Sequence, residues 1–217
     1  MVKEPTHPPV ENKEIIKKKL RILAAGDTHG DSRLTKKLAD RAEREEVDLV
    51  VLCGDITGWV ETKDIIKPFK DKHKRVLILP GNWDSFATAD FLAQLYGVRN
   101  IHGYAVKYED VGFFGAGGAD GPGPGATTER ELMKNLEKAH RGLKGIEKKI
   151  MVTHMHPAGS KSEFSGIGGS AAVRKAIKEF EPDILLHSHI HEASGMEEKI
   201  GKTRVINVGR EGKVIEI

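Results

Sequence analysis

The sequence predicts an α/β fold built around a parallel β-sheet. Three short apolar runs indicate strands, and each of them ends at turn residues: Ile22–Ala25, Val47–Cys53 and Val76–Leu79. Segments with helical spacing of apolar residues follow these runs, namely one with Leu34, Leu38 and Ala42 on one face, then residues 62–70 and residues 86–96. Strands that alternate with helices in this way are typical of a parallel sheet with right-handed crossovers.

The second half of the chain is less regular and predicts further strands. A hairpin is expected from Tyr104–Tyr108 and Val111–Phe114, followed by a loop over residues 115–125 that is rich in glycine and proline. The remaining expected elements are helices over 128–140 and Ala171–Phe180 and strands over Ile150–Thr153, Ile184–His187, Ser194–Glu198, Arg204–Val208 and Val214–Ile217. Because short links join several of these strands, we expect a second, mixed sheet.

Composition indicates one globular domain without a membrane segment. The chain has 217 residues, of which 38% are hydrophobic and 31% charged, and no apolar run approaches the ~20 residues of a membrane helix. Cys53 is the only cysteine, so no internal disulfide is possible and a cytoplasmic location is expected. The net charge of +3 comes from interspersed charges and does not argue for a nucleic-acid or membrane partner. We expect residues 1–20 to form an arm and residues 21–217 to form the domain.

Five short polar segments lie at or just past predicted strand ends. They are Asp27-Thr28-His29, Gly54-Asp55, Gly81-Asn82-Trp83-Asp84, Thr153-His154 and His189-Ile190-His191. Ligands of open α/β sheets bind at the carboxyl ends of the strands, so these segments are expected to converge there. Any one of them alone is an ordinary turn or a packed histidine. Their joint occurrence at five strand ends argues against chance.

The residue types of these segments suit a metal centre. Aspartate oxygens and neutral imidazoles are good ligands for manganese, iron, nickel and zinc. One carboxylate has two oxygens and can bridge two ions. Two ions roughly 3.5–4 Å apart can clamp a phosphate and lower the pKa of a bridging water. The sequence therefore predicts a hydrolase of phosphoesters in which a metal-bridging hydroxide attacks phosphorus.

In their order, the five segments resemble the motifs of the calcineurin-like metallophosphoesterase superfamily. Those motifs are Asp-x-His, Gly-Asp, Gly-Asn-His-Asp, Thr-His and Gly-His-x-His, and the resemblance covers roughly residues 21–210. The chain looks most like the small prokaryotic phosphoesterases grouped with cyclic-nucleotide phosphodiesterases. The resemblance implies an α/β fold of four layers, an α/β/β/α sandwich with two mixed β-sheets.

The resemblance also implies the ligands and the substrate. A first ion would be held by Asp27, His29, Asp55 and His191, and a second by Asp55, Asn82, His154 and His189, with Asp55 as the bridge. The expected catalytic residues are Asp27, Asp55, Asn82 and His154. We expect two divalent ions, manganese first and iron, nickel or zinc as alternatives. The expected substrate is a small phosphoester, a diester rather than a monoester, with a nucleotide among the candidates. The sequence leaves open whether the protein forms a homo-oligomer.

Two positions depart from the family pattern. Trp83 stands where the family usually has a histidine assigned to phosphate contact or leaving-group protonation, and Ser188 stands where it usually has glycine. Ser188 puts no ligand in doubt, but Trp83 leaves the proton donor unassigned. It also favours the alternative function, a non-catalytic scaffold of the same fold that binds a partner protein.

Other signals are given structural interpretations. Gly195 to Thr203 nearly matches a phosphate-binding loop, but its spacing is wrong and a hairpin turn is expected. Cys53 is expected to be a buried small hydrophobic residue. His156 and His187 either orient the ligands or merely pack. The loop over 115–125 either borders the substrate cleft or only connects.

Overall fold

A computed structural model describes residues 19–58 and 64–217 of the chain. The arm expected over residues 1–20 lies almost wholly outside the described residues. The helices are α1 (Ser32–Arg44), α2 (Lys67–Asp71), α3 (Phe86–Tyr96), α4 (Glu129–Arg141) and α5 (Ala171–Phe180). The strands are β1 (Arg21–Ala25), β2 (Leu49–Cys53), β3 (Arg75–Leu79), β4 (Arg99–Asn100), β5 (Tyr104–Tyr108), β6 (Val111–Ala116), β7 (Lys148–Thr153), β8 (Ile184–His187), β9 (Glu197–Ile200), β10 (Thr203–Asn207) and β11 (Lys213–Glu216).

The described strands form two sheets, as the sequence predicts. The first sheet has the order β11-β1-β2-β3-β4, in which β11 is antiparallel to β1 and the other pairs are parallel. The second has the order β5-β6-β7-β8-β10-β9, with a parallel centre and antiparallel strands at both edges. The expectation of a second, mixed sheet is confirmed. The segment before Thr203 forms the β9–β10 hairpin rather than a phosphate-binding loop.

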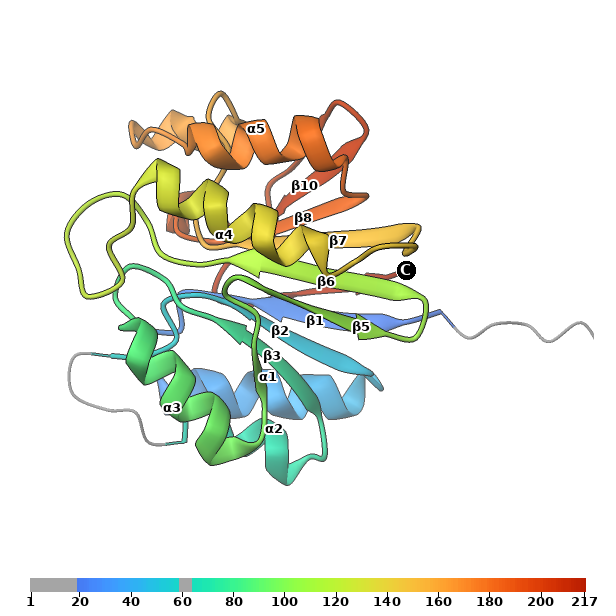
Figure 1. Cartoon of the computed structure of the whole chain (residues 1–217). Helices are drawn as coiled ribbons and strands as arrows, with labels where there is room; N and C mark the ends of the chain where they lie inside the picture. Colours follow the sequence, from blue (N-terminus) through green and yellow to red (C-terminus); the bar gives the residue numbers. More distant parts are fainter. Residues whose placement is uncertain (1–18, 59–63) are drawn as a thin grey trace, which may run out of the picture.

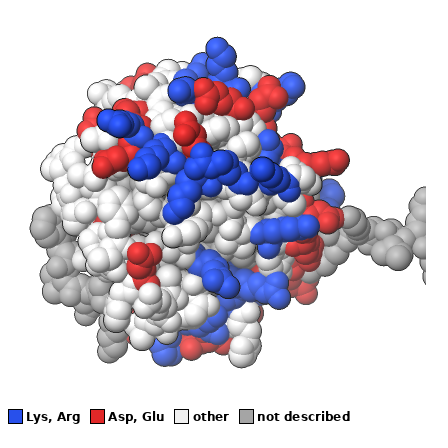
Figure 2. Space-filling model, viewed as in Figure 1, with Lys and Arg blue, Asp and Glu red and all other residues white. Residues whose placement is uncertain are grey.

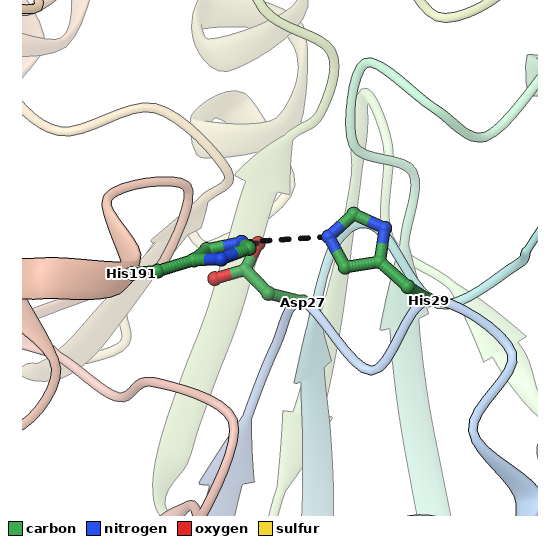
Figure 3. Close-up of side chains that lie close together, drawn as sticks. All are labelled: Asp27, His29 and His191. Carbon is green, nitrogen blue, oxygen red and sulfur yellow. Dashed lines mark hydrogen bonds and ion pairs between the residues drawn. The ribbon is translucent and has the colours of Figure 1, made fainter.

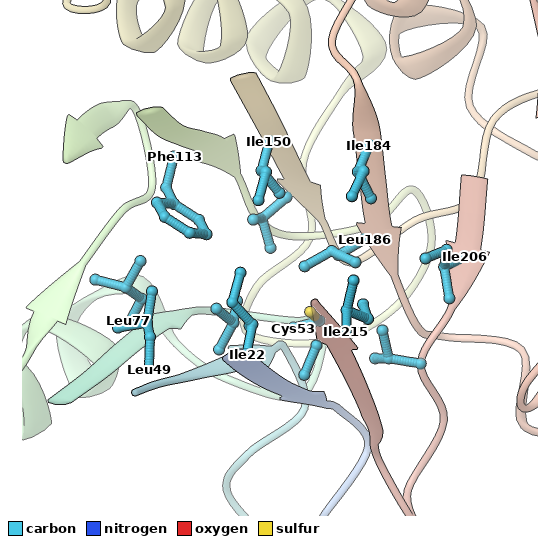
Figure 4. Close-up of a cluster of buried hydrophobic side chains, with 14 of the residues drawn as sticks. Ile22, Leu49, Cys53, Leu77, Phe113, Ile150, Ile184, Leu186, Ile206 and Ile215 are labelled. Atoms are coloured by element: carbon cyan, nitrogen blue, oxygen red, sulfur yellow. The ribbon is translucent and has the colours of Figure 1, made fainter. Parts of the chain in front are cut away.

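The two sheets pack face to face and helices cover both outer faces, which gives the four layers visible in Figure 1. Apolar side chains from both sheets meet in the central core, among them Ile22 and Leu77 from one sheet and Phe113 and Leu186 from the other (Figure 4). A second cluster joins α1, α2 and α3 to the first sheet, and a third joins α4 and α5 to the second. The predicted α/β/β/α sandwich is confirmed.

Local sequence explains where the longer helices begin. Asp31 caps α1 by accepting a hydrogen bond from the amide of Leu34, and Ser85 and Ser170 do the same for α3 and α5. A reciprocal capping box between Thr128 and Glu131 starts α4. These caps set the boundaries of the loops that carry the polar segments.

Some predicted boundaries are wrong. The helix expected over residues 62–70 begins only at Lys67, with Pro68 in its first turn, and the start of the expected range lies outside the described residues. The strand expected over Ser194–Glu198 is displaced to Glu197–Ile200. The reason is that His191–Ala193 forms a turn of 3₁₀ helix that continues into the bend at Gly195.

The surface carries many charges of both signs. Figure 2 shows basic side chains over α4, with acidic side chains beside them. Arg130, Lys134, Lys138 and Arg141 recur along this helix and are exposed. No helix in residues 19–58 and 64–217 is long and apolar enough to cross a bilayer.

Candidate metal centre

All five polar segments lie at the same end of the sandwich. Asp27, Asp55 and Asn82 follow β1, β2 and β3 of the first sheet. His154 follows β7, and His189 and His191 follow β8 of the second sheet. Backbone hydrogen bonds tie the first two loops together, since the amide of Asp27 donates to the carbonyl of Gly54 and that of His29 to the carbonyl of Asp55. The structure therefore gathers the seven predicted ligands from both sheets.

Asp27, His29 and His191 form the first group of candidate ligands. Their ligand atoms all lie within 4.8 Å of one another. The two imidazoles face each other with 3.4 Å between their Nε2 atoms, and Nε2 of His191 lies 3.9 Å from Oδ1 of Asp27 (Figure 3). The carboxylate is completely buried whereas the two rings are partly open to solvent. An ion in this group would thus lie at the surface end of the site.

A second group surrounds the ring of His154. Its Nε2 atom lies 3.0 Å from Oδ1 of Asn82, 3.1 Å from Nδ1 of His189 and 3.3 Å from Oδ2 of Asp55. Four potential ligand atoms thus converge from four separate loops. Asp55 also approaches the first group, because its Oδ2 lies 3.9 Å from Nε2 of His29. Asp27 belongs to the first group and also lies within 4.8 Å of Asp55 and His154, so the two groups adjoin at both carboxylates.

The charges in the centre call for a cation. Burial raises the pKa of Asp27 above its usual value. Burial would also lower the pKa of His154, but the carboxylates of Asp55 and Asp27 outweigh it and raise this pKa to about 9. Burial lowers the pKa of His189 to about 3, so that its ring is neutral. Two buried carboxylates therefore demand positive charge beside His154, which a proton or a metal ion can supply.

The hydrogen bonds of His154 direct one ring nitrogen toward the other ligands. Its Nδ1 lies 3.0 Å from the carbonyl oxygen of Cys53, which can only accept, so Nδ1 carries a hydrogen. The hydroxyl of Ser188 donates to the same carbonyl at 2.7 Å and lies 3.1 Å from Nδ1. Nε2 is thus left facing Asp55, Asn82 and His189, which is the arrangement of a histidine that ligates a metal. The donor set fits a divalent transition metal.

Four of the candidate ligands have left-handed backbone conformations. The φ angles are 53° for Asp27, 46° for His29, 50° for Asp55 and 71° for His189. This region costs a residue other than glycine on the order of 1–3 kcal/mol, and such residues cluster at functional sites. The strained backbone conformations thus occur at the residues whose side chains turn toward the centre.

Two glycines make room for the ligands. A β-carbon on Gly81 would lie 2.0 Å from Oδ1 of Asp55, and one on Gly54 would lie 2.5 Å from Nδ1 of His154. Gly54 also has a φ of 94°. Glycine at these motif positions is therefore required by the close approach of loops that are distant in sequence.

Two residues that position the centre were not predicted from the sequence. Asp84 is completely buried, and its carboxylate accepts hydrogen bonds from the amides of Ile56, Thr57 and Gly81 and from the hydroxyl of Thr57. Asn207 donates to the carbonyl of Ile190 between the two histidines. Asp84 belongs to a recognised motif, but nothing in its sequence position reveals the four donors. Asn207 has no motif.

Three other residues that the sequence analysis considered, Cys53, His156 and His187, pack near the candidate ligands. Cys53 is fully buried, as predicted, and burial raises the pKa of its thiol. The Nε2 atom of His156 lies 3.3 Å from the carbonyl oxygen of Ile167, and Nδ1 of His187 lies 3.2 Å from the carbonyl oxygen of Ser188. The ring of His156 stacks near that of His189, with 6.3 Å between the centroids. Both histidines thus adjoin the candidate ligands without entering either group.

Trp83 lies beside the centre and borders a pocket. Its backbone amide donates to Oδ1 of Asp55 at 2.9 Å, and 36% of the residue is exposed. The pocket has a volume of about 310 Å³. The described residues that line it are His29, Thr57, Gly58, Trp83, Ser85, Thr88 and Pro124. Pro124 belongs to the glycine- and proline-rich loop, which therefore borders this pocket.

Comparison with known proteins gives one family and several solved structures of similar fold. The calcineurin-like phosphoesterase superfamily domain matches residues 20–215. No curated protein matches the chain in sequence.

Among solved structures, the protein TT1561 of Thermus thermophilus aligns with a TM-score of 0.72 and 19% identity over 92% of this chain and 99% of that one. A novel archaeal phosphodiesterase aligns with a TM-score of 0.52 and 17% identity over 91% of this chain and 100% of that one. A dimetal phosphatase from Danio rerio aligns with a TM-score of 0.55 and 13% identity over 88% of this chain and 87% of that one. At these identities the likeness concerns the fold.

Proposed function

The chain belongs to the calcineurin-like phosphoesterase superfamily, and from this premise we propose that it hydrolyses small phosphodiesters with two divalent metal ions. The observation that carries the proposal is the convergence of two groups of ligand atoms on one oxygen of Asp55, 3.9 Å from Nε2 of His29 and 3.3 Å from Nε2 of His154. One carboxylate that faces two ligand groups is what a paired metal site requires.

The proposal divides the ligands between the ions. Asp27, His29, Asp55 and His191 would hold one ion, and Asp55, Asn82, His154 and His189 the other. Two such ions would lower the pKa of a water and neutralise charge on the phosphoryl oxygens. We expect manganese in both positions, because the set mixes carboxylate, amide and imidazole ligands.

The chain's own residues hold these groups in place. Asp84 fastens the loop of Asp55 to the loop of Asn82, and Ser188 and the Cys53 carbonyl orient His154. Preorganised ligands need little rearrangement during the reaction.

A diester is proposed because no lysine or arginine is among the described residues that line the adjoining pocket. The extra charge of a monoester would find no lysine or arginine among these described residues. A cytoplasmic location completes the proposal, supported by the single, buried cysteine.

The test is hydrolysis of bis(4-nitrophenyl) phosphate by the manganese-loaded protein, before and after chelation. We expect activity that chelation abolishes. Asp55→Asn should lose about two manganese equivalents and at least 10²-fold in activity, because a neutral amide bridges two cations poorly. Asp90→Asn is the control, since Asp90 is exposed and accepts a hydrogen bond from Asn100. An inactive protein that still binds manganese would favour the scaffold function. Full activity in Asp55→Asn would disprove the bridge.

A further inference from the structure

We propose that the pocket beside His29 binds an uncharged aromatic ring of the phosphoester, which rests on the proposed function and extends it to a substrate class. The pocket adjoins the centre directly, because His29 belongs to the first ligand group and also lines the pocket. A substrate whose phosphoryl group lies at the metals can thus extend its organic part into this space. The described lining then determines which organic part fits.

Trp83 supplies the aromatic surface. Its amide hydrogen bond to Asp55 ties the backbone that carries the indole to a candidate metal ligand. The main chain of Trp83 is therefore held beside the candidate centre. Aromatic rings stack favourably on tryptophan whatever their identity, because every such ring has a π-face.

The described lining also offers hydroxyl groups. Ser85 and Thr88 share a hydrogen bond of 2.7 Å between their side-chain oxygens, and the Ser85 oxygen also accepts the amide of Thr88. Two hydroxyls have two hydrogens, and their mutual bond uses one, so one hydrogen remains for a ligand. The hydroxyl of Thr57 donates to Asp84 at 2.6 Å, which leaves its oxygen able to accept. A ring with polar edges can therefore be bound as well as a plain one.

The size of the pocket and the charge of its described lining favour a small, uncharged occupant. A volume of about 310 Å³ is at the small end of the roughly 300–1,000 Å³ of ligand pockets, which suits one ring system rather than an oligonucleotide. Apart from His29 the described lining has no titratable side chain. A second phosphate or another strongly charged group would find no oppositely charged partner apart from His29 among these described residues. An aryl group and a nucleobase share the required chemistry.

Binding of phosphonates to the manganese-loaded protein tests the proposal without turnover. Phenylphosphonate and methylphosphonate have the same charged group and differ in the ring. We expect calorimetry to show that the phenyl compound binds about 5- to 150-fold more tightly. A second pair, adenosine 5′-methylphosphonate and ribose 5-methylphosphonate, tests a nucleobase, because the two compounds differ in the base alone. A preference in the first pair, the second, or both supports the proposal and identifies the source of the ring.

Variants assign the preference to the pocket. Trp83→Ala should bind methylphosphonate as the unchanged protein does and lose most of the preference for the ring. Trp83→Phe should keep most of it. Phe91→Ala is the control, because Phe91 is an exposed aromatic residue on α3 that is 60% accessible and is not among the described lining residues.

The outcomes separate the two proposals. If every phosphonate binds, but rings confer no preference in either pair, the pocket assignment is wrong and the metal centre stands. A preference that survives in Trp83→Ala would also overturn it. If manganese binds and no phosphonate does, or manganese does not bind, the proposed function fails and the pocket assignment fails with it.

Discussion

At the scale of single residues, Asp84 shows how a buried carboxylate can hold an active centre without belonging to its ligands. One of its oxygens accepts from the amide and the hydroxyl of Thr57, and the other from the amides of Ile56 and Gly81. These donors come from the loops after β2 and β3, which carry Asp55 and Asn82. The position of two candidate ligands thus depends on one side chain that contacts neither ion group in the described structure.

Asp84→Asn should therefore destabilise the protein and disturb metal binding together. The amide nitrogen would replace one acceptor oxygen and face buried donors, which costs about 2–3 kcal/mol. Urea unfolding should show this loss in the metal-free protein, and metal analysis should show weaker binding at the Asn82 and His154 group. Asp90→Asn serves as the exposed control. Unchanged stability together with normal metal content would contradict the positioning role.

The convergence of the candidate ligand side chains was predictable because each stands in a recognisable motif at the end of an apolar run. The supporting residues were not. Asn207 and the Cys53 carbonyl act through contacts between loops that follow different strands. Such contacts depend on how two sheets pack together, and a linear pattern carries no record of that packing.

At the scale of elements, α3 and α5 end in the same backbone conformation with different residues. Gly97 ends α3 at φ 60°, and Glu181 ends α5 at φ 44°. Glycine adopts this left-handed conformation without the steric cost that other residues bear. The end of α5 is therefore strained and that of α3 is not.

Exchanging the residue types should change stability in opposite directions. Glu181→Gly should stabilise by about 0.5–1 kcal/mol, and Gly97→Ala should destabilise by about 1 kcal/mol. A β-carbon at Gly97 would have nothing within 4 Å, so that variant tests the backbone alone. Urea unfolding measures both. Lys202→Ala controls for the exposed ion pair with Glu181 and should change little. Destabilisation by Glu181→Gly would refute the argument.

Most strands and helices were predictable from apolar periodicity, and the exceptions have physical reasons. β4 contains only Arg99 and Asn100, whose side chains give no apolar signal. The sequence predicts β11 as a strand but not its place beside β1 in the first sheet, since pairing over such a sequence distance leaves no local pattern.

At the scale of the whole molecule, the candidate metal ligands come from both sheets of the sandwich. A metal ion bound by them would stabilise the folded state only, by about 2.7 kcal/mol at a concentration 100 times the dissociation constant. We expect manganese at that level to raise the melting temperature by about 5–10 °C and chelation to reverse it.

Two ligand variants and a control refine this measurement. His191→Ala should prevent binding of the ion expected at Asp27 and His29. His189→Ala should prevent binding of the ion expected at Asn82 and His154. Each variant should therefore show a smaller rise in melting temperature when manganese is added. His73→Asn changes an exposed histidine outside both groups and should leave the rise intact. An equal melting temperature with and without manganese would show that the ligands do not bind metal in the folded protein.

The pairing of β11 with β1 leads us to expect an order of events in folding. β1 acquires β2 as a neighbour early along the chain, whereas its other neighbour is the last described strand. Contacts between such distant segments form slowly. The carbonyl of Gly209, in the loop between β10 and β11, accepts the amide of Gly26, directly before Asp27. The loop of Asp27 is thus held by a segment near the other end of the described chain, and we expect the capture of a metal ion there to be a late step in the maturation of this protein.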